Sequence, residues 1–140
     1  MNRKDFITTT GKCFCTLLAT SSVAWLGSCA VSKSTVYTAA VQGTKVVVPE
    51  SLFAETKMQV VKVPGWQYNL LVVKEADQTF KALLMRCTHR GYPLTPGKNG
   101  IHCNQHGSQF DLEGTVVKGP ASDPLKAFPV QQKNNELLIG

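Results

Sequence analysis

Two short segments of this chain each place one cysteine close to one histidine. Cys87 and His89 are separated by one residue, Cys103 and His106 by two, and 13 residues lie between the two pairs. A thiolate and an imidazole are both good ligands for zinc and for iron. The repeated mixed pair therefore predicts a metal centre that takes one cysteine and one histidine from each segment.

Two metals remain open at this point. Two cysteines and two histidines satisfy tetrahedral zinc, so a structural zinc site is the first alternative. Zinc fingers, however, usually pair cysteine with cysteine in one knuckle and histidine with histidine on a helix. Here each segment mixes the two residue types, and both segments follow β-type runs. This arrangement suits a binuclear iron–sulfur cluster in which one iron takes both cysteines and the other takes both histidines.

The residues around the two pairs extend this pattern into longer motifs. The first reads CTHRGYPL from Cys87 to Leu94, the second reads CNQHGSQFD from Cys103 to Asp111, and Gly114 and then GPASDPL from Gly119 to Leu125 follow. These segments resemble the two cluster-binding boxes and the proline-containing loop of Rieske iron–sulfur proteins. The resemblance runs from Thr44 to Gly140.

The resemblance implies a particular cofactor and a set of site residues. It implies one [2Fe–2S] cluster per chain, with the ligands Cys87, His89, Cys103 and His106. The proline-containing loop would cover the cluster with Gly119, Pro120 and Pro124. Two neutral imidazoles in place of two thiolates make such a site less negative. The potentials of the family therefore lie above those of all-thiolate clusters, at roughly −150 to +300 mV.

Some positions depart from the quinol-oxidising branch of the family that the chain resembles. That branch has a further cysteine in each box, joined as a disulfide, where this chain has Tyr92 and Gln105. It also has a tyrosine that donates a hydrogen bond to a ligand sulfur, where this chain has Phe110. Ser108 is kept, and its hydroxyl would bond a bridging sulfide. Hydrogen bonds to sulfur stabilise the reduced state and so raise the potential. Because Phe110 cannot donate the bond that the tyrosine donates, we expect a middle or low potential within the Rieske range, as in the ferredoxin-like branch.

The segments that must position these residues predict short strands. Val, Leu, Ile and Phe are frequent in them, and Gly, Pro or Asn bound them. The candidate strands are 45–49, 59–63, 68–74, 80–86, 115–118, 128–133 and 136–139. Residues 49–53 predict one helical turn, and Asn134 and Asn135 predict the tip of a hairpin. The expected fold is all-β: an antiparallel sandwich or partly open barrel with a small cluster-binding loop subdomain.

The first 30 residues have the layout of an export signal. A charged segment at residues 2–5 precedes an apolar, uncharged stretch from Cys13 to Val31. Leu26-Gly27-Ser28-Cys29 resembles a bacterial lipobox, in which Cys29 would be lipidated. Residues 2–7 resemble a degenerate twin-arginine signal with Lys4 at the second arginine. The alternatives are an uncleaved transmembrane anchor, because 19 uncharged residues are just long enough to span, and a buried amphipathic helix.

These features predict three parts of the chain and a location. We expect a signal peptide at residues 1–29, a tether at 30–43 and a Rieske domain at 44–140. The mature protein would be attached to the membrane through its N-terminus, on the periplasmic or cell-surface side of a bacterium. With Cys13 and Cys15 in the signal and Cys29 lipidated, no cysteine beyond the two metal ligands is left for a disulfide. We therefore expect the metal centre to stabilise the fold.

The overall charge and the remaining histidine restrict the function. The net charge is +6, but the chain has no run of Lys and Arg, so we expect no nucleic-acid partner. Arg86, Arg90 and Lys98 would form a basic rim for an acidic redox protein, or would simply be solvated charges of the loops. An oxygenase needs a mononuclear iron with two further histidines and a carboxylate, and His102 is the one histidine outside the two pairs.

The expected function is therefore that of an electron-transfer protein. It would pass single electrons to or from a redox partner at the membrane and would not be an enzyme by itself. Two alternatives stay open. In the first, the chain would be the small Rieske subunit of a larger oxidoreductase complex. In the second, it would be a zinc-stabilised binding module without a redox role.

Overall fold

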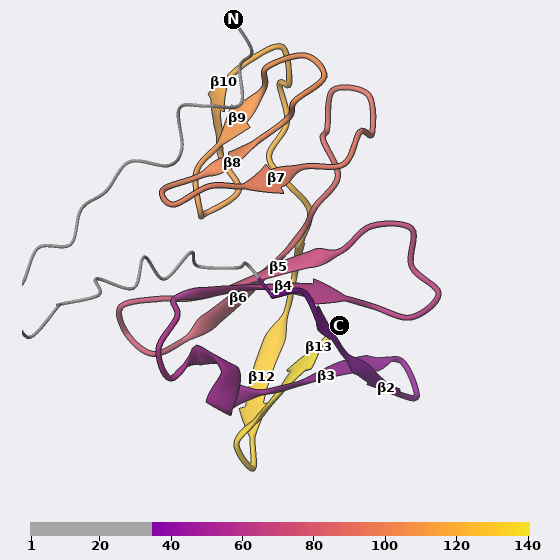
Figure 1. The fold of residues 1–140 in the computed structure, drawn as a ribbon, viewed down its shortest axis with the longest axis vertical. Helices are drawn as coiled ribbons and strands as arrows, with labels where there is room; N and C mark the ends of the chain where they lie inside the picture. Colours follow the sequence, from indigo (N-terminus) through magenta and orange to yellow (C-terminus); the bar gives the residue numbers. More distant parts are fainter. Residues whose placement is uncertain (1–34) are drawn as a thin grey trace, which may run out of the picture. The chain divides into compact units, whose positions relative to one another are not determined.

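The structure is a computed structural model that describes residues 35–140. The described chain forms thirteen short strands and one 3₁₀ turn, η1 (Glu50–Phe53). The strands are β1 (Tyr37–Thr38), β2 (Ala40–Gln42), β3 (Lys45–Pro49), β4 (Met58–Lys62), β5 (Leu70–Lys74), β6 (Phe80–Leu84), β7 (Thr95–Pro96), β8 (Ile101–His102), β9 (Gln109–Phe110), β10 (Val116–Lys118), β11 (Ala127–Phe128), β12 (Val130–Lys133) and β13 (Glu136–Ile139) (Figure 1). No α-helix occurs among the described residues, so the predicted all-β class is confirmed.

The strands form three sheets, none of which closes into a barrel. One sheet has the order β1-β4-β5-β6-β11, the second β12-β13-β3-β2, and the third β10-β9-β8-β7. All pairs are antiparallel except β1 with β4, which is parallel. Figure 1 shows the third sheet set apart from the other two. It is the small subdomain that carries one of the two Cys–His segments.

Strand β5 explains how the sheets stack, because its two faces are both buried. Leu70 and Val72 belong to one apolar core, while Leu71 and Val73 belong to another. Successive side chains of a strand point to opposite faces, so the unbroken apolar run of residues 70–73 indicates a strand that is covered on both faces. The five-stranded sheet is therefore the middle layer.

The two cores have different partners. The sandwich core lies between the five-stranded sheet and β3 and β13, and contains Val46, Val48, Val61, Leu70, Val72, Ala82, Leu137 and Ile139, with Phe53 and Phe80. The loop-side core lies between the other face of that sheet and the third sheet, and contains Leu71, Val73, Leu83, Met85, Leu94, Ile101, Phe110, Ala121 and Leu125, with Cys87 and Cys103. The two cysteines are thus part of an apolar core of their own.

Several predicted elements are confirmed, two strands at their bounds and the helical turn with a start one residue later than predicted. The strands 45–49 and 136–139 agree with β3 and β13, and the helical turn is η1. The hairpin tip is confirmed as well, since Lys133 pairs with Glu136 and the asparagines between them have φ of 52° and 62°. Two consecutive residues in this left-handed region make the type I′ turn that suits a two-residue hairpin.

The predicted tether of residues 30–43 is wrong for residues 37–42. These residues form β1 and β2, which pair with β4 and β3, and Ala39 between them is buried in the sandwich core. Each strand has only two or three residues and takes its hydrogen bonds from a neighbouring strand. A strand stabilised mainly by its neighbours leaves a weak pattern in its own sequence. The predicted signal, residues 1–29 with Cys29, lies outside the described residues.

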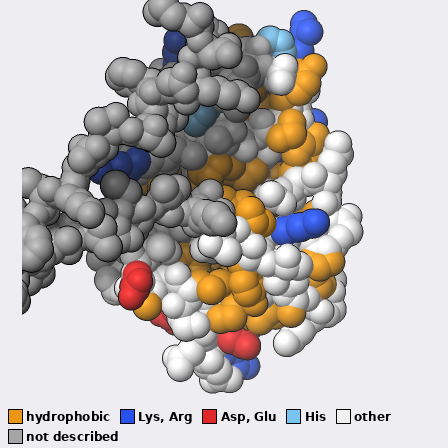
Figure 2. Space-filling view, in the orientation of Figure 1, with side chains coloured by type: hydrophobic (Ala, Val, Ile, Leu, Met, Phe, Trp, Pro, Cys, Tyr) orange, Lys and Arg blue, Asp and Glu red, His pale blue; other side chains and the backbone are white. Residues whose placement is uncertain are grey.

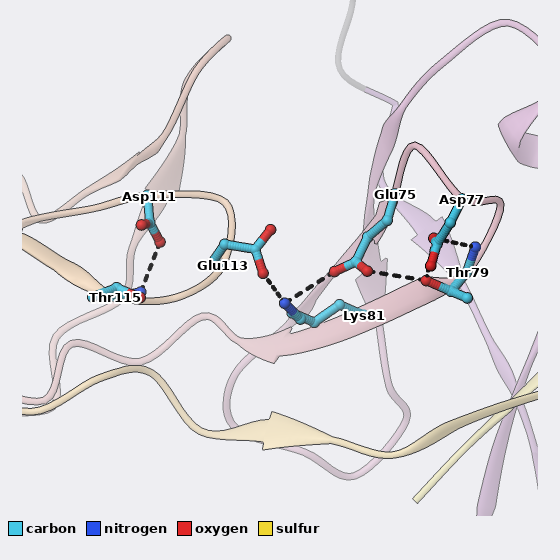
Figure 3. Close-up of polar contacts among 7 residues, drawn as sticks. All are labelled: Glu75, Asp77, Thr79, Lys81, Asp111, Glu113 and Thr115. Carbon is cyan, nitrogen blue, oxygen red and sulfur yellow. Dashed lines mark hydrogen bonds and ion pairs between the residues drawn. The ribbon is translucent and has the colours of Figure 1, made fainter.

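An ion-pair network joins the third sheet to the middle layer (Figure 3). Lys81 of β6 contacts Glu75 at 2.9 Å and also pairs with Glu113, which lies in the turn between β9 and β10. The bonds from Glu113 and then Glu75 raise the pKa of Lys81, and the bonds from Lys81 and Thr79 lower the pKa of Glu75. Because the network is partly exposed, each pair contributes only about 0.2–1 kcal/mol.

Within residues 35–140 the structure contains no helix that is long and apolar enough to span a membrane.

Candidate metal centre

The two Cys–His segments form loops with the same backbone hydrogen bonds. The first Cys–His loop (residues 87–92) connects β6 to β7, and the second (residues 103–108) connects β8 to β9. In each, the cysteine N–H donates to the carbonyl five residues on, and the cysteine carbonyl accepts from the glycine N–H four residues on. The bonds are Cys87 to Tyr92 at 2.8 Å, Gly91 to Cys87 at 2.8 Å, Cys103 to Ser108 at 2.8 Å and Gly107 to Cys103 at 2.9 Å.

A glycine is required at the fourth position after each cysteine. Gly91 and Gly107 have φ of 74° and 78°, a left-handed conformation that side chains other than glycine adopt only with strain. The glycines that follow the two histidines in the sequence are therefore structural parts of the loops. They let each loop fold back, so that the glycine N–H reaches the carbonyl of the cysteine.

The structure brings the four predicted ligands together. Cys87 and Cys103 are each 1% exposed and neither is in a disulfide. Their thiols lie close enough for that of Cys87 to lower the pKa of Cys103. The rings of His89 and His106 meet edge to face, with centroids 4.9 Å apart. His89 is half-buried and His106 is exposed. The thiols thus lie inside the molecule and the imidazoles lie toward its surface.

The surroundings of Cys103 favour the thiolate form that a metal needs. Burial raises the pKa of this thiol, but the backbone N–H groups of His106 and Gln105 and the thiol of Cys87 hydrogen-bond it and lower the pKa. The net pKa lies below the usual value for cysteine. Donors that point at a sulfur stabilise its negative charge.

A buried atom without a partner indicates that the residues fit a metal group. Nδ1 of His89 is buried and has no hydrogen-bond partner in the structure. A buried polar atom without a partner destabilises a fold by about 1–3 kcal/mol, and such atoms are rare. Two thiols and two imidazoles are also the donor set of a [2Fe–2S] centre with mixed ligands, which needs only two protein ligands for each iron. No three His, Cys, Asp or Glu side chains in residues 35–140 are grouped around one point as a single ion would need.

A third segment, the proline loop (residues 119–125), contacts both Cys–His loops. Thr88 donates its hydroxyl to the carbonyl of Asp123 at 2.7 Å, and the N–H of Ala121 donates to Oγ of Ser108 at 3.0 Å. Ala121 and Leu125 are buried in the loop-side core. Gly119, Pro120 and Pro124, the residues predicted to cover the cluster, are themselves exposed. The contacts of the loop therefore come from the residues between the prolines.

Two further residues that the sequence analysis missed support the Cys–His loops. Tyr68 donates its hydroxyl to the carbonyl of Gly91 at 2.7 Å, and Asn104 donates its amide to the hydroxyl of Thr95 at 3.0 Å. Arg86 lies over the Tyr68 ring, with 5.9 Å from Cζ to the ring centroid. Tyr68 precedes β5, far from the loops in sequence, so no local motif indicates its contact.

The two residues predicted to tune the centre are buried beside it. Phe110 is 1% exposed in the same core as both cysteines, and Ser108 is fully buried. His102 ends β8 and lines a surface groove of 330 Å³ with Gln109, Asp111 and Val117. His102 is not part of either Cys–His loop.

Comparison with known proteins agrees with this geometry. The Rieske [2Fe–2S] domain family matches residues 43–129. Carotenoid phi-ring synthase of Chlorobaculum tepidum is 34% identical over 88 residues, 57% of this chain and 14% of that protein. Cytochrome b6-f complex iron–sulfur subunit 2 of Nostoc sp. is 31% identical over 86 residues, 60% of this chain and 48% of that protein. The match thus spans about half or less of the length of these curated relatives.

A solved structure shows the same fold. The cyanobacterial plasma membrane Rieske protein PetC3 from Synechocystis PCC 6803 superposes with a TM-score of 0.57 at 24% identity. The superposition covers 66% of this chain and 94% of that one. The family match includes more than half of the chain and both Cys–His loops. The chain therefore belongs to the Rieske [2Fe–2S] family and carries one [2Fe–2S] cluster.

Proposed function

We propose that Cys87, His89, Cys103 and His106 hold the cluster, and that the chain exchanges single electrons with a redox partner at a membrane. The observation that carries the proposal is the pairing of two buried thiols with two outward imidazoles, one of which has a buried nitrogen without a partner. When bound, the cluster supplies one-electron chemistry at roughly −150 to +300 mV.

The chain's own residues give the two sides of the centre different roles. On the inner side, the loop-side core keeps water from Cys87 and Cys103, and backbone N–H groups stabilise the charge on Cys103. On the outer side, the exposed ring of His106 offers a short route to the surface. We propose that the partner docks on this side, against His106 and its exposed neighbours Tyr92 and Gln105.

The charges near the first Cys–His loop favour an acidic partner. Arg86 and Arg90 are exposed on either side of His89 in the sequence, and both carry a permanent positive charge. Opposite charges on the partner would speed its approach and fix its orientation. On the face drawn in Figure 2, Lys and Arg side chains stand apart from one another and form no continuous basic stripe. A stripe of that kind is what nucleic-acid binding uses.

Metal and sulfide analysis of the purified protein tests the proposal directly. We expect two iron atoms and two acid-labile sulfides per chain, a brown-red colour and an electron paramagnetic resonance signal only after reduction. A colourless protein with one zinc ion per chain would instead establish the zinc-stabilised module.

A second candidate is a Rieske subunit of a larger oxidoreductase. It is favoured by the similarity to an iron–sulfur subunit of a cytochrome b6-f complex. Native gel electrophoresis of detergent-solubilised membranes distinguishes the two candidates. A subunit would migrate in a large assembly, whereas an independent carrier would migrate near its own mass.

The membrane attachment is proposed through lipid on Cys29. The proposal rests on Leu26-Gly27-Ser28-Cys29 after an uncharged apolar stretch. One acyl chain binds a membrane only marginally, but the several chains of a bacterial lipoprotein anchor it stably.

Replacement of Cys29 by alanine is expected to block this processing. The Cys29→Ala protein should remain a precursor of higher mass and incorporate no labelled fatty acid, whereas Cys15→Ala should be processed like the wild type. Mass spectrometry of the protein from membranes measures both properties. Normal processing of Cys29→Ala, with no lipid on the wild type, would rule out the lipobox.

The tuning role of Phe110 is tested by adding a hydroxyl. In Phe110→Tyr the hydroxyl enters the core that contains both cysteines, where a sulfur is the acceptor we propose. A hydrogen bond of about 0.5–1.5 kcal/mol that strengthens on reduction raises the potential by roughly 20–65 mV. Phe128→Tyr, at a half-buried ring outside that core, should leave the potential unchanged. Film voltammetry measures both, and an unchanged or lower potential in Phe110→Tyr would show that position 110 does not face a sulfur.

A further inference from the structure

The ring of Tyr92 crosses from the first Cys–His loop to the second. Its centroid lies 5.4 Å from that of His106, and the rings meet edge to face at 68°. His106 in turn meets His89 at 4.9 Å. The three rings form a row, Tyr92 to His106 to His89, although Tyr92 itself is 41% exposed. Large exposed aromatic side chains that pack on one polar ring are candidates for a positioning role.

The backbone of the first loop fixes where this ring starts. The carbonyl of Tyr92 accepts the N–H of Cys87 at 2.8 Å, and Gly91 before it is held in the left-handed conformation. The carbonyl of Gly91 also accepts the hydroxyl of Tyr68. Hydrogen bonds to the carbonyls of Gly91 and Tyr92 therefore fix the backbone on both sides of the Tyr92 Cα, and this limits the positions that the ring can occupy.

The side-chain hydrogen bonds that Thr88, Asn104 and Ser108 make connect the Cys–His loops to other segments of the chain. Thr88 bonds Asp123, Asn104 bonds Thr95, and Ser108 accepts from Ala121. Within the described chain, the thiol pair, the histidine pair and the Tyr92 ring connect side chains of the two Cys–His loops. Tyr92 is thus a residue outside the four proposed ligands whose side chain contacts the opposite loop.

His106 is the proposed ligand that most needs such support. It is exposed, whereas His89 is half-buried and both cysteines are buried. An exposed imidazole rotates freely about its terminal bond unless a neighbour restricts it. The Tyr92 ring packs against one side of the imidazole, where it would restrict that rotation and keep water away.

We propose that Tyr92 is a positioning residue of the centre: it holds the His106 ring in its binding orientation and limits the access of water to it. The inference rests on the proposed function, in which His106 is a ligand. Removal of the ring should therefore change the electronic properties of the cluster as well as its lifetime. Reduction adds a negative charge that water stabilises, so the potential should rise when water reaches His106.

Three variants of the full-length holoprotein test this role. Tyr92→Leu removes the ring and Tyr92→Phe keeps it. Trp66→Leu removes another 41% exposed aromatic, which packs on Phe128 of β11. In Tyr92→Leu we expect cluster loss to an iron chelator to be roughly 2- to 12-fold faster, the factor that an edge-to-face pair corresponds to. We also expect a higher potential and altered g values in the electron paramagnetic resonance spectrum. Tyr92→Phe and Trp66→Leu should match the wild type.

Each other result contradicts one specific step. If Tyr92→Leu keeps the wild-type potential and g values, Tyr92 does not position His106, whatever the rate of cluster loss. If Tyr92→Phe behaves like Tyr92→Leu, the hydroxyl and not the ring matters, and the inference is wrong. If the wild type binds no cluster at all, the proposed ligand set fails first, and the inference fails with it.

Discussion

Replacement of any one of the four proposed ligands is expected to abolish the visible absorption of the protein. The variants are Cys87→Ser, His89→Ala, Cys103→Ser and His106→Ala. Each removes one of only two protein donors on an iron, and a serine hydroxyl is a far poorer ligand for iron than a thiolate. The four residues also connect the two Cys–His loops, so we expect the loops to separate in these variants.

Loss of the cluster should leave much of the chain folded. The sandwich core contains none of the four residues, whereas the loop-side core contains both cysteines. Metal binding contributes directly to the stability of the part that it joins. We therefore expect the far-ultraviolet circular dichroism of the sandwich to persist in these variants, with a lower temperature for the first unfolding transition.

The third histidine is the matched control. His102→Ala changes the residue next to Cys103, yet His102 faces a surface groove beside Gly97 and belongs to neither loop. It should keep the wild-type spectrum and iron content. A full wild-type spectrum in any of the four ligand variants would remove that residue from the ligand set. A colourless His102→Ala would show that the centre includes a histidine other than the two proposed.

The sequence predicts the centre better than the sheets around it. The chemistry is local: each proposed ligand pair spans three or four residues, and Gly91 and Gly107 are required within the same loops. The long strands are predicted for a similar reason, since the apolar run of β5 reports burial on both faces. In the Cys–His loops and in β5, a few adjacent residues are enough to determine the local structure.

The elements that escape prediction depend on distant partners. β7, β8 and β9 have two residues each. They are strands only because β7 hydrogen-bonds β8 across the turn of residues 97–100 and β8 hydrogen-bonds β9 across the second Cys–His loop. The same holds for β1 and β2 in the segment predicted as a tether. Tyr68 supports Gly91 from 23 positions earlier in the chain. No pattern of neighbouring residues contains such information.

Substitution of alanine for Gly100 is expected to disturb the centre although Gly100 lies outside both Cys–His loops. Gly100 is in the turn between β7 and β8, and a Cβ there would lie 2.7 Å from the carbonyl oxygen of Phe110 in β9. Real Cβ atoms essentially never come this close to a backbone oxygen. The oxygen cannot rotate away as a side chain would, so β8 and β9 must move apart.

The second Cys–His loop would move with them, because this loop connects the end of β8 to the start of β9. Ile101 pairs with Phe110, and both side chains are buried beside the cysteines. Forcing one extra carbon into such a site destabilises a protein by about 1–3 kcal/mol. We therefore expect Gly100→Ala to lower the free energy of unfolding by this amount and to lose its cluster faster than the wild type.

Asn99→Ala provides the control, because Asn99 is the exposed neighbour of Gly100 in the same turn. A change at such a surface position alters the free energy of unfolding by less than about 0.5 kcal/mol. Thermal unfolding of the two holoproteins, followed at the visible band and by circular dichroism, measures both effects. If Gly100→Ala and Asn99→Ala unfold alike and keep the same potential, β8 and β9 tolerate a side chain between them. The close approach of the two strands would then not be what holds Cys103 and His106 in place.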